Sequence, residues 1–109
     1  MSFNGNEGDM ITLDTGAAWT KNYRDSGLSN GINAIFYGKN KLQSILSQTG
    51  CMGIRIYNAI DDAGTPVMVL VGTDANENDI TSGYILERGI GCPPNCGGGG
   101  GGTSNPLQG

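Results

Sequence analysis

The stretch DANEND places three oxygen-bearing side chains at alternate positions: Asp74, Asn76 and Asn78. A calcium-binding EF-hand loop begins in this way, with oxygen ligands at its positions one, three and five. The rest of that motif is missing, because position six is Asp79 instead of glycine and position twelve is Ile85 instead of glutamate. The favoured interpretation is therefore a polar turn between two strands, with a calcium loop as the alternative.

Other side chains with catalytic potential lack a partner at a useful spacing. Asp61 and Asp62 are adjacent in a predicted turn, whereas two catalytic carboxylates must face one substrate from different environments. Histidine is absent, which removes the commonest general base. Ser29 in GLSNG does not have the spacing of a nucleophile elbow, and YGKNK lacks the glycine-rich loop of a phosphate site. We therefore expect a protein that is not an enzyme, with no cofactor and no evident small-molecule substrate.

The three cysteines are Cys51, Cys92 and Cys96, and an odd number argues against a fully paired secreted framework. All three could be free thiols. Alternatively, Cys92 and Cys96 could form a disulfide across CPPNC, which would leave Cys51 as a small buried hydrophobic residue. A structural zinc site needs about four ligands, so three thiols without histidine make an incomplete set, and no metal is expected.

The charge pattern excludes several classes of partner. The net charge is −4 and the six basic residues are scattered, so we expect no binding to a nucleic-acid backbone. No apolar stretch approaches the roughly 18 residues that a membrane span requires. The stretch MSFNGNEGDM lacks the basic and apolar regions of a secretory signal, which predicts synthesis in the cytoplasm and leaves the final location open.

The first predicted element is a helix over residues 11–27. Thr12 or Asp14 can cap its start, and Gly27 lies where a glycine commonly follows a helix. Trp19 and Tyr23 are four residues apart and therefore share one face. Paired aromatic residues at this spacing usually pack in a core, so we expect both side chains to be buried.

The remaining elements follow from hydrophobic periodicity: a strand at 32–38, a helix at 39–50, and strands at 51–60, 67–74 and 84–90. The strand at 67–74 is apolar on both faces, which predicts a central position in the sheet and a hairpin with 51–60. This order predicts an α+β fold, with two short helices packed on a mainly antiparallel sheet of about four strands.

We expect three parts along the chain: a polar N-terminal segment at 1–10, an α+β domain at 11–91, and an extended Cys/Pro/Gly-rich C-terminal tail at 92–109. The tail contains six consecutive glycines: Gly97, Gly98, Gly99, Gly100, Gly101 and Gly102. Ordering six glycine backbones costs roughly 6–12 kcal/mol. Only backbone hydrogen bonds and close contacts can offset that cost, because glycine has no side chain.

A neighbouring subunit can provide such contacts, for example by pairing the tail with a sheet edge. Only 15% of the residues are charged, against about 25% in typical domains, which fits a surface partly covered by neighbours. The sequence therefore predicts a structural protein that assembles with copies of itself, as a homo-oligomer, filament or other polymer, through the glycine-rich tail. The alternative is a small monomeric module that binds a peptide or ligand, with the glycines as a flexible linker.

Five stretches carry a family resemblance: AWTKNYR, CMGIRIYNA, VLVGTDANENDI, CPPNC and NPLQG. Over residues 11–109 the chain resembles a family of small bacterial proteins that share NYR, GCxGIRxY, VLVGxDxxGND and CPxxC motifs. No activity is established for that family, so the resemblance implies none and no functional residue is carried over. The chain departs from the family where GND is replaced by Glu77-Asn78-Asp79, and in the run of six glycines.

Overall fold

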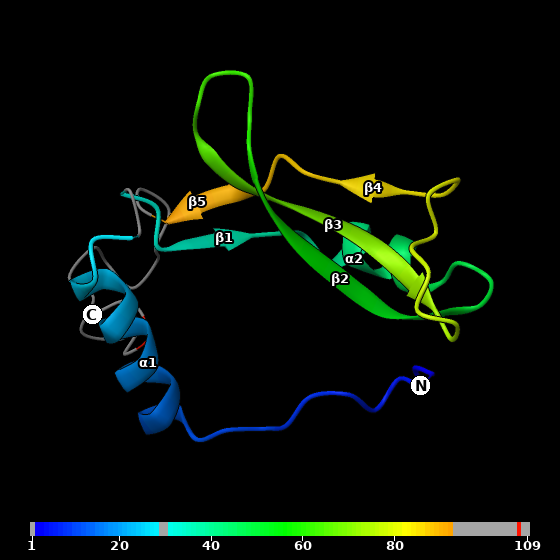
Figure 1. Ribbon diagram of the computed structural model, residues 1–109, viewed down its shortest axis with the longest axis horizontal. Coiled ribbons are helices and arrows are strands. Elements are labelled where there is room, and N and C mark those ends of the chain that lie inside the picture. The colour runs from blue at the N-terminus through cyan, green and yellow to red at the C-terminus, as the bar shows by residue number, and fades with distance from the viewer. Residues whose placement is uncertain (1, 29–30, 93–106, 108–109) are drawn as a thin grey trace. The chain divides into compact units, whose positions relative to one another are not determined.

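The computed structural model describes residues 2–28, 31–92 and 107. In this part of the chain the elements are α1 (Leu13–Asp25), β1 (Ala34–Phe36), α2 (Lys39–Leu46), β2 (Cys51–Ile60), β3 (Pro66–Asp74), β4 (Ile85–Leu86) and β5 (Ile90–Cys92) (Figure 1). All strand pairs are antiparallel, so the predicted α+β class is confirmed. No helix in the described ranges is long and apolar enough to cross a membrane.

The chain divides into two compact units. The first unit contains residues 2–8 and 37–89, and the second contains the described residues of 9–36 and 90–109. The strands form one sheet in each unit, so the single sheet of about four strands is replaced by a sheet of three and a sheet of two.

The sheet of the first unit has the order β2-β3-β4. The β2–β3 hairpin runs in register from Cys51 opposite Asp74 to Ile60 opposite Pro66, with one irregularity near the start of β2 (Figure 1). The predicted hairpin and the central position of β3 are therefore confirmed. β2 is ten residues long and lies at an edge of this sheet, so β3 is the only described strand that pairs with it.

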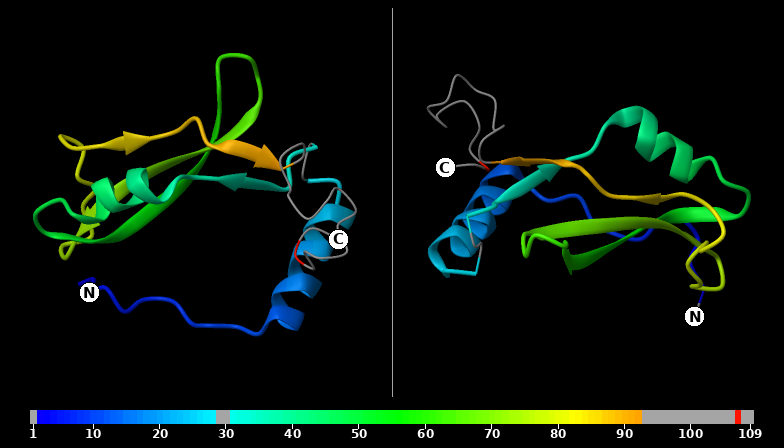
Figure 2. Two further views of the ribbon diagram at one scale, coloured as in Figure 1. Left: turned by 180° about the vertical axis from the view of Figure 1, so that it is seen from behind. Right: turned by 90° about the horizontal axis from the view of Figure 1, so that it is seen from above.

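Helix α2 packs on the hairpin (Figure 2). Its residue Ile45 is only 1% exposed, and its Cγ2 would lie 3.3 Å from a Cβ added to Gly72 on β3. The hydroxyl of Tyr37, just before α2, donates a 2.8 Å hydrogen bond to the carbonyl oxygen of Met68. The core of this unit therefore lies between α2 and the adjacent face of β3.

The predicted strand 84–90 is interrupted. Arg88 adopts a left-handed backbone conformation with φ of 68°, which a regular strand does not contain. The Glu87 carboxylate accepts hydrogen bonds from the backbone N–H groups of Arg88 and Gly89 at this turn. Consequently β4 pairs with β3, whereas β5 belongs to the other sheet and pairs with β1.

The second unit contains α1 and the β1–β5 pair. The Thr12 side chain accepts a 3.1 Å hydrogen bond from the backbone N–H of Thr15, and Gly27 follows the helix with φ of +80°. Both predicted ends of this helix are thus confirmed. On β1, Phe36 is exposed.

The prediction that Trp19 and Tyr23 pack in a core is wrong. Both are exposed, Trp19 by 60%. The covered side of α1 instead contains Gly16, where an added Cβ would lie 3.1 Å from Cδ2 of Leu107. Arg24 on the same side donates a 2.8 Å hydrogen bond to the Leu107 carbonyl oxygen. Small residues allow this close approach, so the small-residue face is covered in place of the aromatic one.

Candidate functional site

Most of the residues that the sequence nominated lie outside the described part of the chain. These are Gly97 to Gly102 and Cys96, so the predicted assembly contact and the possible disulfide stay predictions. Cys92 is buried at the end of β5. Cys51 is a half-buried free thiol at the start of β2, and its sulfur donates to the Gly53 carbonyl oxygen at 3.2 Å.

The adjacent carboxylates Asp61 and Asp62 lie in the turn between β2 and β3. One oxygen of Asp61 accepts hydrogen bonds from the backbone N–H groups of Ala63 and Thr65, both at 2.9 Å. Asp62 is exposed. The two side chains therefore do not form a pair facing one substrate, and Asp61 stabilises the turn.

The DANEND stretch forms the predicted polar turn at the end of β3. Oδ1 of Asp74 accepts hydrogen bonds from the backbone N–H groups of Asn76 and Asn78, at 2.9 and 3.0 Å. The side chain that begins the half-complete calcium motif is thus used to close the turn. Within residues 2–28, 31–92 and 107, no three His, Cys, Asp or Glu side chains are grouped so that they could hold a metal ion.

Asp79, at the end of this turn, is the centre of a polar cluster. Its Oδ1 accepts hydrogen bonds from Arg55 Nη1 at 2.8 Å and from Thr73 Oγ1 at 3.1 Å. Its Oδ2 accepts a short hydrogen bond from the Tyr57 hydroxyl. We call these four residues the Asp79 cluster. Because both carboxylate oxygens accept hydrogen bonds from sheet residues, the cluster ties the turn to the sheet.

The hairpin register explains why the cluster forms. Arg55 and Tyr57 alternate along β2 and therefore project from one face of the sheet. Thr73 is opposite Gly53 in the ladder, so it projects from that same face. The turn after β3 then folds back, with Asp79 bridged to Thr73, and brings its carboxylate over this face.

The contacts lower the pKa of Asp79 below its usual value of 3.8. The hydrogen bond from Tyr57 has the largest effect, followed in the same direction by the Thr73 hydroxyl and the Arg55 charge, against an opposing effect of burial. A carboxyl whose pKa is depressed by folding stabilises the folded state above its unfolded pKa. That stability is lost as the pH falls through the lower, folded pKa.

We therefore expect the first unit to lose stability below about pH 4, and Asp79→Asn to reduce that loss. At pH 7 the variant should be less stable than the wild type, and the difference should shrink towards pH 3. Urea unfolding followed by circular dichroism at several pH values measures this. The matched control is Asp62→Asn, since Asp62 is exposed. Parallel pH profiles for Asp79→Asn and the wild type would contradict the assigned role.

Glu77 in the same turn adopts a left-handed conformation with φ of 70°. A side chain in this region costs roughly 1–2 kcal/mol relative to glycine. We expect Glu77→Gly to be about 1 kcal/mol more stable than Glu77→Ala. Both variants lose the Glu77 carboxylate and differ only by the alanine Cβ, so the comparison isolates the cost of a Cβ at this φ. Equal urea midpoints for the two variants would contradict a backbone cost at position 77.

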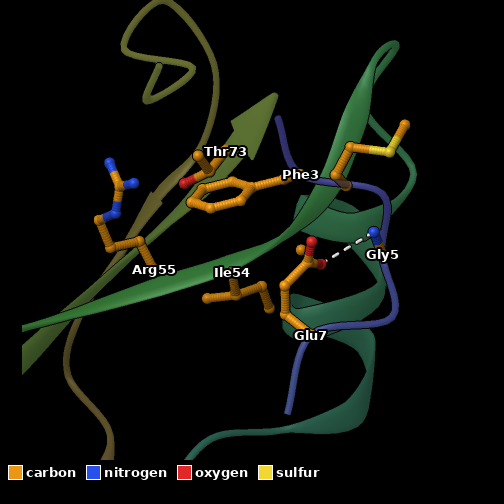
Figure 3. Close-up of a pocket in the computed structure, with 8 residues that line it drawn as sticks. Phe3, Gly5, Glu7, Ile54, Arg55 and Thr73 are labelled. Carbon is orange, nitrogen blue, oxygen red and sulfur yellow. Dashed lines mark hydrogen bonds between the residues drawn. The ribbon is translucent and has the colours of Figure 1, made fainter. Parts of the chain in front are cut away.

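A hollow of about 320 Å³ lies next to the Asp79 cluster (Figure 3). Consecutive β2 residues line it, Met52 to Arg55, so it follows the edge of the strand. Residues of the 2–8 segment line its other side. The backbone N–H of Phe3 donates a 3.0 Å hydrogen bond to the Ala75 carbonyl oxygen, and the Arg55 guanidinium lies 5.6 Å from the Phe3 ring centroid. We call this site the Phe3 hollow.

A second hollow, of about 590 Å³, lies beside α2. Its lining is polar and uncharged: Asn40, Gln43, Ser44, Ser47, Gln48, Thr49 and Tyr84. Gln48 is already engaged, because its Nε2 donates to the Ile45 carbonyl oxygen and its Oε1 accepts from the Tyr84 N–H. This arrangement contains no acid–base pair.

Neither the Asp79 cluster nor the Phe3 hollow was predicted from the sequence. The signal that could have indicated the cluster is the shared face of Arg55 and Tyr57, opposite a strand that leads into an acidic turn. No protein-family model, curated protein or solved structure matches the chain.

Proposed function

We propose that the protein is a structural subunit that associates with copies of itself along the edge of β2. The observation that carries this proposal is the exposure of apolar side chains on the second half of that edge strand. Ile56 is 59% exposed and Ile60 is 73% exposed. A long, exposed, apolar edge strand is a template for pairing with another chain.

The charge distribution supports a second copy as the partner. Arg55 is the one charged residue of β2, and it is paired with Asp79. The part of the strand from Ile56 to Ile60 has no charge, so two copies can align there without like-charge repulsion. Natural edge strands commonly carry lysine or proline that prevents such pairing, and this half of β2 has neither.

The polar groups of the first unit favour a structural role over catalysis. In the Asp79 cluster, each ionised group has an opposite charge or a hydrogen-bond donor as its partner. An active site would instead need an acid or base whose proton can move to a substrate. The alternative function, a monomeric binding module, is supported by the Phe3 hollow, since a ligand could lie along the edge of β2 there.

The glycine run 97–102 is the proposed second contact between copies, and Gly99→Ala with Gly100→Ala tests it. If backbones press together at these positions, each added Cβ costs more than about 1 kcal/mol at every contact. Since 1.4 kcal/mol corresponds to a factor of ten, the concentration left in solution after pelleting should rise about tenfold or more.

The double alanine variant is preferable to deleting residues 97–109, because Leu107 contacts α1 through Arg24. It leaves that contact in place, so an unchanged circular dichroism spectrum is expected. Equal supernatant concentrations for wild type and variant would contradict packing of the glycines between copies. If neither the wild type nor the variant pellets at any concentration, the result favours the monomeric alternative.

A further inference from the structure

Residues 2–8 are held on the first unit by a small set of contacts (Figure 3). The Phe3 N–H donates to the Ala75 carbonyl oxygen at 3.0 Å, and the Phe3 ring lies 5.6 Å below the Arg55 guanidinium. Gly5 is close to the strand edge, because a Cβ added there would lie 3.4 Å from the Met52 carbonyl oxygen. The segment thus covers the first half of the β2 edge.

The segment is also shaped by its own hydrogen bonds. The two Glu7 carboxylate oxygens accept from the backbone N–H groups of Asn4 and Gly5, at 2.9 and 3.0 Å. The Asn4 side-chain oxygen accepts from the Asn6 N–H at 2.9 Å. Because these bonds lie within residues 4–7, the segment can leave and rejoin a surface with little change of shape, which lowers the entropic cost of binding.

A short exposed stretch connects this segment to α1. The boundary between the two units falls between Gly8 and Asp9. Residues 9–12 are exposed, and Met10 is fully exposed. Gly8 has φ of +103°, a conformation available to glycine but rarely to other residues. Because residues 9–12 are exposed, the segment 2–8 is held by its own contacts and not by contacts of the residues that link it to α1.

We propose that the β2 and β3 residues lining the Phe3 hollow also bind residues 2–8 of a second copy, which then take the place of the molecule's own residues 2–8. This inference rests on the proposed self-association and names one of its contacts. The contacts are identical in both arrangements, so exchange of the segment costs little beyond the loss of its local concentration. A tethered segment has an effective concentration in the millimolar range, so exchange requires the crowding that an assembly provides.

Exchange also explains how an assembly can grow. When two copies exchange segments reciprocally, the result is a closed dimer. When each copy gives its segment to the next, the contact is heterologous and the assembly continues in one direction. The exposed Ile56–Ile60 half of β2 remains available in both arrangements.

Photo-crosslinking in a mixture of two isotopic forms tests this proposal. Full-length protein labelled with ¹⁵N carries p-benzoylphenylalanine in place of Phe3, and unlabelled wild-type protein is the other component. After irradiation, mass spectrometry identifies whether residue 3 is joined to a labelled or an unlabelled peptide. The control carries the same photoprobe in place of the exposed Phe36.

We expect crosslinks from labelled residue 3 to unlabelled peptides that contain Met52–Arg55 or Thr73–Ala75, above the concentration at which particles form. The Phe36 control should not give these crosslinks. Crosslinks only within one chain would overturn the exchange. If sedimentation of the same samples shows particles, the proposed function stands without the exchange. If it shows monomers at every concentration, the proposed function fails as well.

Discussion

Ile45→Ala is expected to destabilise the unit of residues 2–8 and 37–89 by about 2–4 kcal/mol. Ile45 is the most buried apolar side chain of the described residues, at 1% exposure, and it faces Gly72. Because Gly72 has no side chain that could move into the space, the cavity left by the mutation should not collapse. This loss is a large fraction of the 5–15 kcal/mol that typically stabilises a domain.

The urea midpoint from far-ultraviolet circular dichroism measures this loss. Leu46→Ala is the matched control, since it removes a similar side chain from the next position of α2, where the residue is exposed. It should cost less than about 1 kcal/mol. Similar midpoints for the two alanine variants would show that the core of this unit does not lie between α2 and β3.

Ile56→Lys combined with Ile60→Lys should raise the concentration of protein that stays in solution about tenfold or more. Each substitution places an ammonium on an edge strand that has no charge between residues 56 and 60. Two copies paired along β2 would bring these charges together and would have to desolvate them. A loss of 1.4 kcal/mol per contact is enough for a tenfold change.

The control for this variant is Leu46→Lys, which adds a positive charge to an exposed position of α2. The net charge of −4 becomes less negative in both variants, so an effect of net charge alone would lower the concentration that stays in solution. If the β2 edge is the contact, Leu46→Lys should have little effect. Circular dichroism must show that each variant is folded. A folded double variant that pellets like the wild type would exclude the second half of β2 as the contact.

Sequence patterns correctly predicted those elements whose conformation depends on residues that are neighbours in the sequence. The Thr12 side chain caps α1 through a residue three positions away, and the glycine at position 27 adopts the left-handed conformation that follows a helix. The β2–β3 hairpin follows from two apolar strands that a short polar turn joins. In each case neighbouring residues decide the conformation, so one stretch of sequence is enough.

The errors arise where contacts between residues distant in the sequence determine the conformation or the burial of a residue. The strand predicted at 84–90 ends early because Arg88 is left-handed, and a non-glycine residue gives no sign of this in the sequence. Trp19 is exposed because Leu107, 88 positions away, contacts the Gly16 side of α1. Periodicity finds a face of the right composition, but it does not identify which face another segment covers.

The candidate site was missed for a related reason. Arg55 and Tyr57 are two positions apart and so share one face of β2, but the sequence indicates for their partner Asp79 only a misfit at position six of a calcium loop. Its role depends on how the turn folds back over the sheet, which the sequence does not encode as a motif. The Phe3 hollow likewise requires that a polar segment, expected outside the core, return to the edge of β2.

Sedimentation velocity of the full-length protein over a wide concentration range tests the central claim most directly. The account predicts that the weight-average sedimentation coefficient rises with concentration and that species larger than a dimer appear. The Ile56→Lys, Ile60→Lys variant should shift this rise to about tenfold higher concentration or beyond. A single species with the mass of one chain, unchanged from micromolar to millimolar concentration, would contradict self-association.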